Sequence, residues 1–544
     1  MNASALHEPR PEVDTTLGRV RGVRDQSTGV CAYLGLPYAA PPVGPRRFRP
    51  PAPAAGWSGV RDASRFGPPA AQYFDPHEAP LDELVDAPPA SVPRWVGSED
   101  CLTLNVWTKA SPGERRPVLV WIHGGANWLE SSRLRVYHGA ALAAAGAVFV
   151  SLNYRLGVFG FTDVAALGDE SYAGSHSLGL RDQLAALDWV HANVERFGGD
   201  PANVTVVGES AGSMDLSWLI AGGHLDGRAR RAVLMSGVAG VPGLAQHDDY
   251  DFYAEAEGRR QARELYALLG IDGVSQLLAT STGELLERLA RAVPSRDMLF
   301  HWDSLFYPRV DGTFLPRTPF EAVQAGAARG LDLMVGSTAY EMSLWLLWDD
   351  GLDARDPREL ARRLPGFPPA VIPAAAEAYE RWFGHGGAGS PGLHLLGDAM
   401  FVMPALALAA LQAQVGGRAY AYQFTWECAD PRLKAVHAAD VGFFLGTFET
   451  PGAEALIGAP GSPRERAARR ELAGRMQSAL LAFAERGDPN PLDVAPRERW
   501  LAYSTELRSL MLFGSPSRVA YDPLLARRSW WQQHVYGRRL PGAP

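Results

Sequence analysis

Short apolar runs bounded by turn residues recur along the chain and predict buried strands. These runs occupy residues 118–122, 148–152, 204–207, 232–235, 331–335 and 419–424. Helical patterns lie between many of them, among them residues 180–196 and 211–220. Strands that are apolar on both faces and alternate with helices are typical of a mostly parallel sheet covered on both sides. The pattern therefore predicts an α/β fold.

Three parts of the chain depart from this alternation. Residues 16–23 and 31–36 predict a small antiparallel start to the sheet. Residues 245–330 and 350–410 are mostly helical in pattern, and we expect them to be insertions that cap the sheet. No Gly/Ser-rich or charged linker divides the chain, so we expect residues 1–544 to form one large domain with these elaborations.

Composition narrows the class of protein. The chain has 544 residues, 47% of them hydrophobic and 21% charged, which excludes disorder for its bulk. A formal net charge of −8 disfavours nucleic acid as a partner. We find no run of eighteen apolar residues and no apolar signal segment at the N-terminus, so we expect a cytoplasmic protein that does not bind membranes. In that compartment its three cysteines would be reduced thiols.

The most informative segment is Gly208-x-Ser210-x-Gly212, which directly follows a predicted strand and precedes a predicted helix. In this context the motif predicts a nucleophile elbow, in which small residues let the chain turn sharply and expose the serine hydroxyl. The helix N-terminus adds free N–H groups and a positive dipole. The structural alternative is an ordinary strand–turn–helix joint built from small residues.

A second predicted strand, residues 118–122, ends in His123-Gly124-Gly125-Ala126. Glycine-rich loops in this position direct backbone N–H groups at a developing oxyanion. We therefore predict an oxyanion hole made by the N–H groups of Gly125, Ala126 and Ala211. The alternative is a simple glycine turn.

A serine nucleophile needs a neighbouring base, and in hydrolases with this elbow the chain order is serine, acid, histidine. Four histidines lie well past the middle of the chain: His385, His394, His437 and His534. His534 lies near the C-terminus, and His385 and His394 lie in a glycine-rich interruption. His437 follows the predicted strand 419–424 through a short loop and is the predicted base.

The acid should follow another strand between the serine and the histidine. Glu341 lies just beyond the predicted strand 331–335. Such a carboxylate holds the imidazole in one tautomer and stabilises the imidazolium. The residues alone leave Asp350 open as an alternative.

These motifs resemble those of the type-B carboxylesterases, the family of bacterial para-nitrobenzyl esterases and cholinesterases. The resemblance covers almost the whole chain. Its motifs are YLGLPYA at residues 33–39, SEDCLTLNV at 98–106, NYRLG at 153–157, FGGDP at 197–201, GESAG at 208–212 and GDPN at 487–490. The resemblance implies an α/β-hydrolase fold, a mostly parallel sheet flanked by helices, with Ser210, Glu341 and His437 as the catalytic triad.

The sequence departs from the family pattern at several positions. The oxyanion loop, usually His-Gly-Gly-Gly-Phe, ends here in Ala126-Asn127, which is expected to change the acyl or alcohol groups that fit. Glu341 lies in Tyr-Glu-Met where the family has Asp-Glu-Gly. Asp215 follows the nucleophile motif where small residues are common, either as a substrate-facing charge or as a partner of the helix dipole. Ser236 matches a serine that the family often places near the triad.

Aromatic residues near these motifs are candidates for an apolar pocket, with core packing as the alternative. The candidate pocket residues are Asn127, Trp128, Trp218, Trp345 and Trp348. The chain has no zinc-binding cysteine pairs and no His-Glu-x-x-His helix, so we expect neither a metal nor an organic cofactor. The oligomeric state stays open between monomer and homodimer.

The motifs together predict a serine carboxylesterase that acts on small-molecule esters through an acyl-enzyme intermediate. A carbamate, amide or thioester hydrolase or an acyltransferase would use the same triad. A non-catalytic binding protein on this fold is a remote alternative, because such proteins lack part of the triad.

Overall fold

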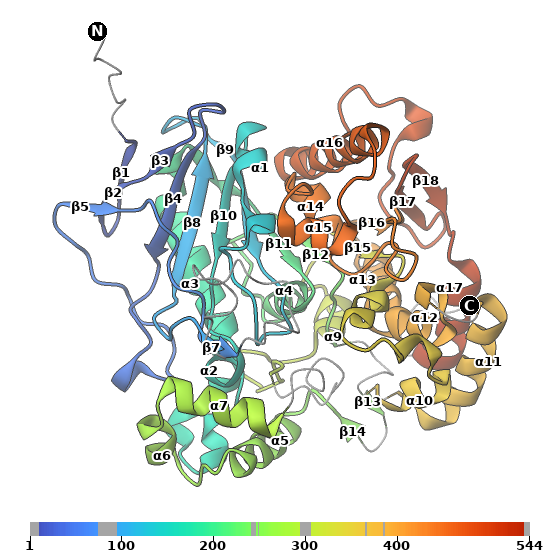
Figure 1. Ribbon diagram of the computed structural model, residues 1–544, viewed down its shortest axis with the longest axis horizontal. Coiled ribbons are helices and arrows are strands. Elements are labelled where there is room, and N and C mark those ends of the chain that lie inside the picture. The colour runs from blue at the N-terminus through green and yellow to red at the C-terminus, as the bar shows by residue number, and fades with distance from the viewer. Residues whose placement is uncertain are drawn as a thin grey trace.

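The computed structural model describes residues 10–73, 95–240, 246–247, 250–293, 306–364, 367–384 and 387–537 (Figure 1). Within these residues, eleven strands form one large sheet. The strands are Val23–Arg24 (β3), Cys31–Pro37 (β4), Thr103–Thr108 (β8), Arg116–Ile122 (β9), Val148–Leu152 (β10), Gly199–Glu209 (β11), Arg231–Met235 (β12), Asp332–Thr338 (β15), Arg418–Phe424 (β16), Ser509–Phe513 (β17) and Arg518–Tyr521 (β18). Their order across the sheet is β18-β17-β16-β15-β12-β11-β9-β10-β8-β4-β3.

The centre of the sheet is parallel and its edges are antiparallel. All pairs from β10 through β9, β11, β12, β15 and β16 to β17 are parallel. The outer pairs β17–β18, β10–β8, β8–β4 and β4–β3 are antiparallel. The six apolar runs coincide with β9, β10, β11, β12, β15 and β16 to within a few residues at each end, so the predicted α/β fold with a mostly parallel sheet is confirmed.

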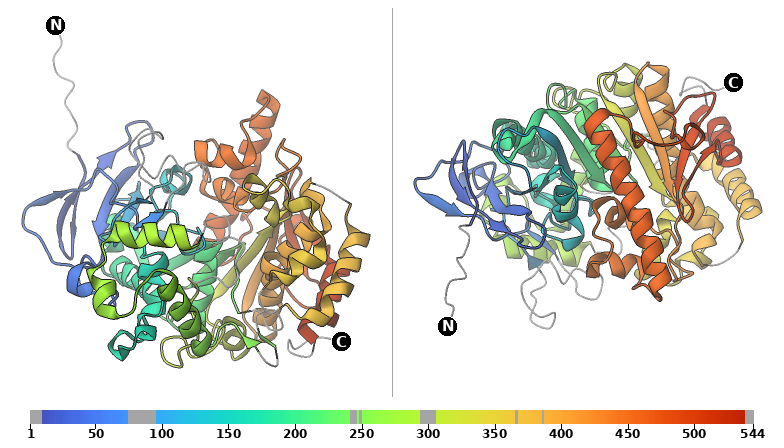
Figure 2. Two further views of the ribbon diagram at one scale, coloured as in Figure 1. Left: turned by 60° about the horizontal axis from the view of Figure 1, so that its bottom comes forward. Right: turned by 90° about the horizontal axis from the view of Figure 1, so that it is seen from above.

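Helices cover both faces of the sheet, which is why its strands are apolar on both sides. In β9, Val118 and Val120 lie in one core cluster, whereas Leu119 and Trp121 lie in the other. The first cluster includes residues of α3 (Leu178–Asn193), α4 (Ala211–Ala221) and α13 (Met403–Gln414). The second includes residues of α1 (Ala140–Ala144), α14 (Ala439–Leu445) and α16 (Pro463–Arg486). Figure 2 shows α16 lying across its face of the sheet.

The predicted antiparallel start of the sheet is divided between two sheets. Residues 31–36 lie in β4, which pairs antiparallel with β8 in the large sheet. Residues 18–21 of the predicted strand 16–23 instead form β2 (Gly18–Arg21), which pairs with β1 (Glu12–Thr15) and β5 (Val60–Asp62) in a separate three-stranded sheet, whereas Val23 lies in β3 of the large sheet.

The two segments predicted to be helical insertions contain helices in their described parts. Residues 245–330 hold α5 (Glu255–Leu268), α6 (Val274–Ala279), α7 (Thr282–Ala292) and α9 (Pro319–Gln324). Residues 350–410 hold α10 (Pro357–Arg362), α11 (Ile372–Trp382), α12 (Pro391–Gly397) and most of α13. Helices α5–α7 and α10–α12 lie at opposite sides of the molecule (Figure 1). That these segments cap the active site stays a prediction.

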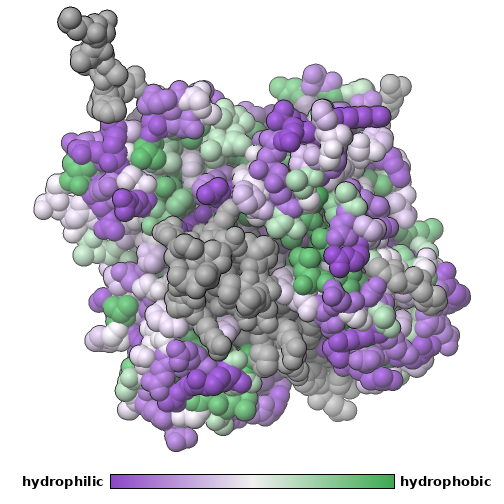
Figure 3. Space-filling model, viewed as in Figure 1, coloured by the Kyte–Doolittle hydropathy of each residue, from purple (hydrophilic) through white to green (hydrophobic). Residues whose placement is uncertain are grey.

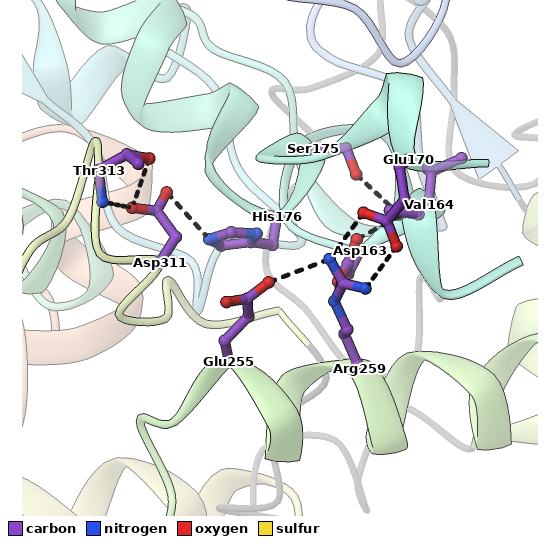
Figure 4. A network of polar contacts seen from close by, with 10 residues as sticks. Asp163, Val164, Glu170, Ser175, His176, Glu255, Arg259, Asp311 and Thr313 are labelled. Carbon is purple, nitrogen blue, oxygen red and sulfur yellow. Dashed lines mark hydrogen bonds and ion pairs between the residues drawn. The ribbon is translucent and has the colours of Figure 1, made fainter. Parts of the chain in front are cut away.

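Polar contacts fasten the first of these segments to the body of the protein (Figure 4). Arg259 on α5 pairs with Glu170 at 2.7 Å and Asp163 at 3.3 Å, and within α5 it pairs with Glu255 at 3.0 Å. Nearby, His176 Nε2 lies 3.7 Å from Asp311 Oδ2. Because Arg259 is only a quarter exposed, this cluster fixes α5 against residues 163–170 more firmly than surface ion pairs would.

The helical run Pro391–Gln414, which includes α12 and α13, is long and apolar enough to cross a membrane. Of its most apolar window, 94% is buried inside the protein, and core helices of soluble proteins pass the same test. The run packs against β15 and β16, which accounts for its composition.

Figure 3 shows mostly hydrophilic side chains over the described part of one molecular face.

The three cysteines, Cys31, Cys101 and Cys428, are free and buried. Cys101 is 1% exposed, and burial raises the pKa of its thiol. It therefore packs as a small apolar side chain, in line with the expectation of reduced thiols.

Candidate active site

The predicted catalytic residues follow the carboxyl ends of neighbouring parallel strands. The oxyanion loop follows β9, Ser210 follows β11, Glu341 follows β15 and His437 follows β16. Because carboxyl ends of parallel strands lie at one edge of a sheet, residues separated by more than 200 positions meet there. The strand order β9-β11-β12-β15-β16 places the loop and the serine on adjacent strands.

Ser210 occupies a strained turn between β11 and α4. Its backbone has φ 53° and ψ −122°, a conformation that costs a non-glycine residue of order 1–3 kcal/mol. The flanking glycines make this turn sterically feasible. A Cβ on Gly208 would lie 2.5 Å from the carbonyl oxygen of Gly212, and a Cβ on Gly212 would lie 2.4 Å from that of Ile122. The predicted strand–serine–helix elbow is thus present.

The predicted base and acid are in direct contact. His437 Nδ1 donates to Glu341 Oε2 at 2.5 Å, and both side chains are buried. The other oxygen, Glu341 Oε1, accepts hydrogen bonds from Ser236 Oγ at 2.8 Å and from the Thr338 N–H at 2.6 Å. These bonds hold the carboxylate in one orientation, so Ser236 lies where the family resemblance implied.

The other ring nitrogen of His437 faces a carboxylate that the sequence analysis did not single out. His437 Nε2 lies 3.2 Å from Glu209 Oε1, and Glu209 is 2% exposed. Burial by itself would lower the pKa of His437, but the negative charges of Glu209 and Glu341 raise it to about 9. Burial raises the pKa of Glu209 well above its ordinary value. The two side chains therefore titrate as a pair.

Glu209 is the residue immediately before Ser210, so the elbow itself brings a carboxylate to the predicted base, His437. Among the described residues, no hydrogen bond joins the Ser210 hydroxyl to His437 Nε2; such bonds are often long before a substrate binds. Gly124 packs over both side chains, since a Cβ there would lie 2.6 Å from Glu209 Oε2 and 3.1 Å from Ser210 Cβ. A glycine is needed at position 124 for this close approach.

The loop after β9 has the backbone needed to present free N–H groups. Gly125, Ala126 and Asn127 all have positive φ, at 88°, 51° and 61°. The N–H groups of Trp128 and Leu129 both bond to the Gly125 carbonyl at 3.0 Å, which closes a tight turn. Within the described part of the chain, no hydrogen bond uses the N–H groups of Gly125, Ala126 or Ala211.

The candidate pocket residues lie in different surroundings. The Trp345 ring lies 5.6 Å from the His437 ring, and Phe401, which the sequence analysis did not identify, lies at 4.7 Å. Trp218 is fully buried and packs edge-on against Tyr253 at 5.4 Å.

The three remaining candidates lie in the loop after β9 or beyond Glu341. Trp128 is buried at the end of the oxyanion turn, and Trp348 is half-buried after the 3-10 helix Glu341–Leu347. The Asn127 side chain, also buried, bonds to Asp215.

The alternatives weighed for the acid and the base lie elsewhere. The Asp350 side chain is 92% exposed and pairs with Arg432 at 3.7 Å. His394 stacks on Phe383 with ring centroids 3.7 Å apart, and His534 bonds to the Trp530 carbonyl. His385 lies outside the described residues.

The described residues offer no cluster of metal-ligating side chains. No group of three or more His, Cys, Asp or Glu side chains there is arranged to bind a metal ion. The site in the described residues consists of a serine, a histidine, carboxylates and backbone N–H groups.

Comparison with known proteins gives one consistent result. A profile of the Carboxylesterase family matches residues 9–527. The chain is 33% identical to the para-nitrobenzyl esterase of Bacillus subtilis over 95% of this chain and 97% of that protein. It is 31% identical to the phenmedipham hydrolase of Pseudarthrobacter oxydans, over 88% and 91%. A solved carboxylesterase of Geobacillus stearothermophilus superposes with a TM-score of 0.79 at 34% identity, covering 96% of this chain and all of that one.

Proposed function

Since this chain belongs to the carboxylesterase family and is a carboxylic ester hydrolase, we propose that Ser210, His437 and Glu341 are its catalytic triad. The observation that carries the assignment is the contact of His437 Nδ1 with Glu341 Oε2 at 2.5 Å, which leaves Nε2 on the side of the nucleophile elbow. A carboxylate in this position fixes the tautomer in which Nε2 can accept a proton.

In the proposed reaction His437 Nε2 takes the proton of Ser210 as the hydroxyl oxygen attacks the ester carbonyl. His437 then donates this proton to the departing alcohol. Water, deprotonated by the same nitrogen, hydrolyses the acyl-enzyme and regenerates Ser210. Glu341, bonded to Nδ1, stabilises the imidazolium that forms in each step.

We assign the oxyanion hole to the N–H groups of Gly125, Ala126 and Ala211. Two of these donors lie on the loop after β9 and the third is the first N–H of α4. One donor in such a hole typically lowers the barrier by about 3 kcal/mol. Their freedom from other hydrogen bonds within the described residues supports the assignment.

The proposed substrates are small-molecule esters with an apolar group near the base. Trp345 and Phe401, which contact the ring of His437, would form one wall of that site. Because one relative is a phenmedipham hydrolase, that compound belongs on the substrate panel with esters of increasing acyl and alcohol size.

The test combines turnover with covalent labelling. Purified protein is assayed with a short-chain p-nitrophenyl ester and treated with an organophosphonate, and the labelled residue is read by mass spectrometry. We expect label on Ser210, and loss of label and turnover in Ser210→Ala. Ser213→Ala is the matched control, because Ser213 is a buried serine on α4, the helix that follows Ser210, and its hydroxyl donates to the Gly237 carbonyl. Label elsewhere, or turnover that survives Ser210→Ala, would refute the triad.

A further inference from the structure

Two consecutive non-glycine residues of the oxyanion loop have left-handed backbone conformations. Ala126 has φ 51° and Asn127 has φ 61°. Such conformations are unfavourable for residues with a Cβ and persist only where the surroundings enforce them. Because the N–H of Ala126 is one of the proposed oxyanion donors, whatever enforces this backbone also aims that donor.

The side chain of Asn127 ties this segment to the nucleophile helix. Asn127 Nδ2 donates to Asp215 Oδ1 at 3.1 Å and to the carbonyl of Phe306 at 3.3 Å. The Asn127 carbonyl in turn accepts from the N–H of Gly157 at 2.6 Å. Asn127 is therefore held at both its side chain and its backbone, immediately after Ala126.

Asp215 is itself held in place. Its second oxygen, Oδ2, accepts a hydrogen bond from Gln183 Nε2 of α3 at 2.6 Å. Asp215, Asn127 and Gln183 are all at most 1% exposed. Among the described residues, the hydrogen bonds to the Asp215 carboxyl come from these two amide side chains, and not from the N–H groups of its own helix, so it does not act as a helix cap.

The position of Asp215 on α4 lets its hydrogen bond with Asn127 link that helix to the oxyanion loop. Asp215 lies one turn beyond Ala211, whose N–H is the third proposed donor. The Asp215–Asn127 bond therefore joins the two structural halves of the oxyanion hole, the loop after β9 and the start of α4. Another loop contact, in which the Tyr154 hydroxyl donates to the carbonyl of His123 at 2.8 Å, does not involve α4.

We propose that Asp215 is a positioning residue for the oxyanion hole, acting through Asn127 on the N–H of Ala126. The inference rests on the proposed function, because it concerns the donors of that site. Asp215 Oδ1 is the acceptor for the Asn127 amide, and Gln183 holds Oδ2, so the carboxyl group is fixed at both oxygens. An apolar side chain at position 215 would release Asn127, and the strained turn would relax away from the geometry that stabilises the oxyanion.

The test compares Asp215→Leu, Asn127→Ala and Asp215→Asn with the wild type. We measure kcat and KM for a p-nitrophenyl ester, the rate of Ser210 phosphonylation, and Tm. The first two variants should lose roughly 10- to 100-fold in kcat and in phosphonylation rate, while KM changes by less than about threefold, because oxyanion donors act chiefly on the transition state. Asp215→Asn keeps an acceptor oxygen and should recover most of the rate.

A matched control separates positioning from general stability. Ser217→Ala removes a buried hydroxyl from the same helix; this hydroxyl donates to the Met214 carbonyl and accepts from the N–H of Ala239. The substitution should lower Tm without a loss in kcat. If Asp215→Leu does not fold, Asn127→Ala removes the same hydrogen bond by changing the residue on the loop.

The outcomes distinguish the two proposals. An active wild type whose Asp215→Leu or Asn127→Ala variant retains its kcat would overturn the positioning role and leave the triad standing. A rise in KM as large as the fall in kcat would also overturn the positioning role. So would a kcat that falls in step with Tm across all variants, including Ser217→Ala. A wild type with neither turnover nor label at Ser210 would overturn both.

Discussion

Replacing Glu209 with glutamine should move the acid limb of the pH–rate profile to lower pH. Glu209 Oε1 lies 3.2 Å from His437 Nε2 in a buried site, so the ionised form of Glu209 stabilises the imidazolium form of the base. Catalysis requires the neutral imidazole. The wild type should therefore gain activity as pH rises through the pKa of His437, which Glu209 and Glu341 together raise to about 9 against the opposing effect of burial.

The size of the shift follows from the geometry. Two unit charges 3.2 Å apart interact by about 5 kcal/mol at an effective dielectric constant of about 20. Burial cancels part of this, since a rise in pKa from 6.5 to about 9 corresponds to roughly 3 kcal/mol. Glu341 remains in the Glu209→Gln variant and keeps part of the effect. We therefore expect the acid limb to fall by at least about one pH unit.

The assay is kcat/KM for a p-nitrophenyl ester over a pH range that brackets 6.5 and 9. Hydrolysis is followed at the isosbestic wavelength of p-nitrophenol, so that ionisation of the product does not distort the profile. The kcat/KM profile reports the free enzyme, in which the contact with Glu209 exists. Glu485→Gln, a change on the exposed surface of α16, serves as the control. An acid limb that stays in place in Glu209→Gln would refute the electrostatic coupling.

Three further outcomes are expected. Glu341→Gln should lower kcat by roughly 10²- to 10⁴-fold, because the amide no longer stabilises the imidazolium of His437; a loss below tenfold in steady-state kinetics would contradict its role. Burial raises the pKa of Asp215 to about 7, so the folded state keeps a proton that the unfolded state releases, and stability falls as pH rises from about 4 to about 7. The free energy of unfolding should therefore fall by up to about 4 kcal/mol across this pH range, and Asp215→Asn should remove that fall. Urea unfolding at both ends of the range measures it, and an unchanged pH dependence in the variant would disprove the assignment to Asp215. Arg155→Ala leaves Asp182 buried without its bidentate partner and should lower the free energy of unfolding by about 3–5 kcal/mol, as measured by urea unfolding. A decrease of under 1 kcal/mol would mean that the two side chains are not coupled.

The sequence was sufficient for every feature that depends on local pattern. Apolar runs on both faces of a strand require cover on both sides, so alternation with helices predicted the parallel sheet before any contact was known. Gly208-x-Ser210-x-Gly212 predicted the elbow, because the turn allows small residues only. Glu341 and His437 could be proposed because each follows a strand whose carboxyl end lies at the same edge of the sheet.

Contacts between segments that lie far apart in the chain could not be predicted from local sequence patterns. Nothing in the sequence places Glu209 against the imidazole of His437, because that contact depends on the relative position of β11 and the loop after β16. The same holds for Phe401, which comes from the segment before α13 and packs against the same ring.

The polar residues around the oxyanion loop show the division between sequence and structure most clearly. The sequence, through its resemblance to the family, marked Asn127 and Asp215 as departures from the residues usual at their positions. It left Asp215 as either a substrate-facing charge or a helix-dipole partner. Only the tertiary structure, which brings positions 88 residues apart to 3.1 Å, decided that the two side chains bind each other. The physical reason is that a buried polar group must find its partner wherever the packing of strands and helices places one.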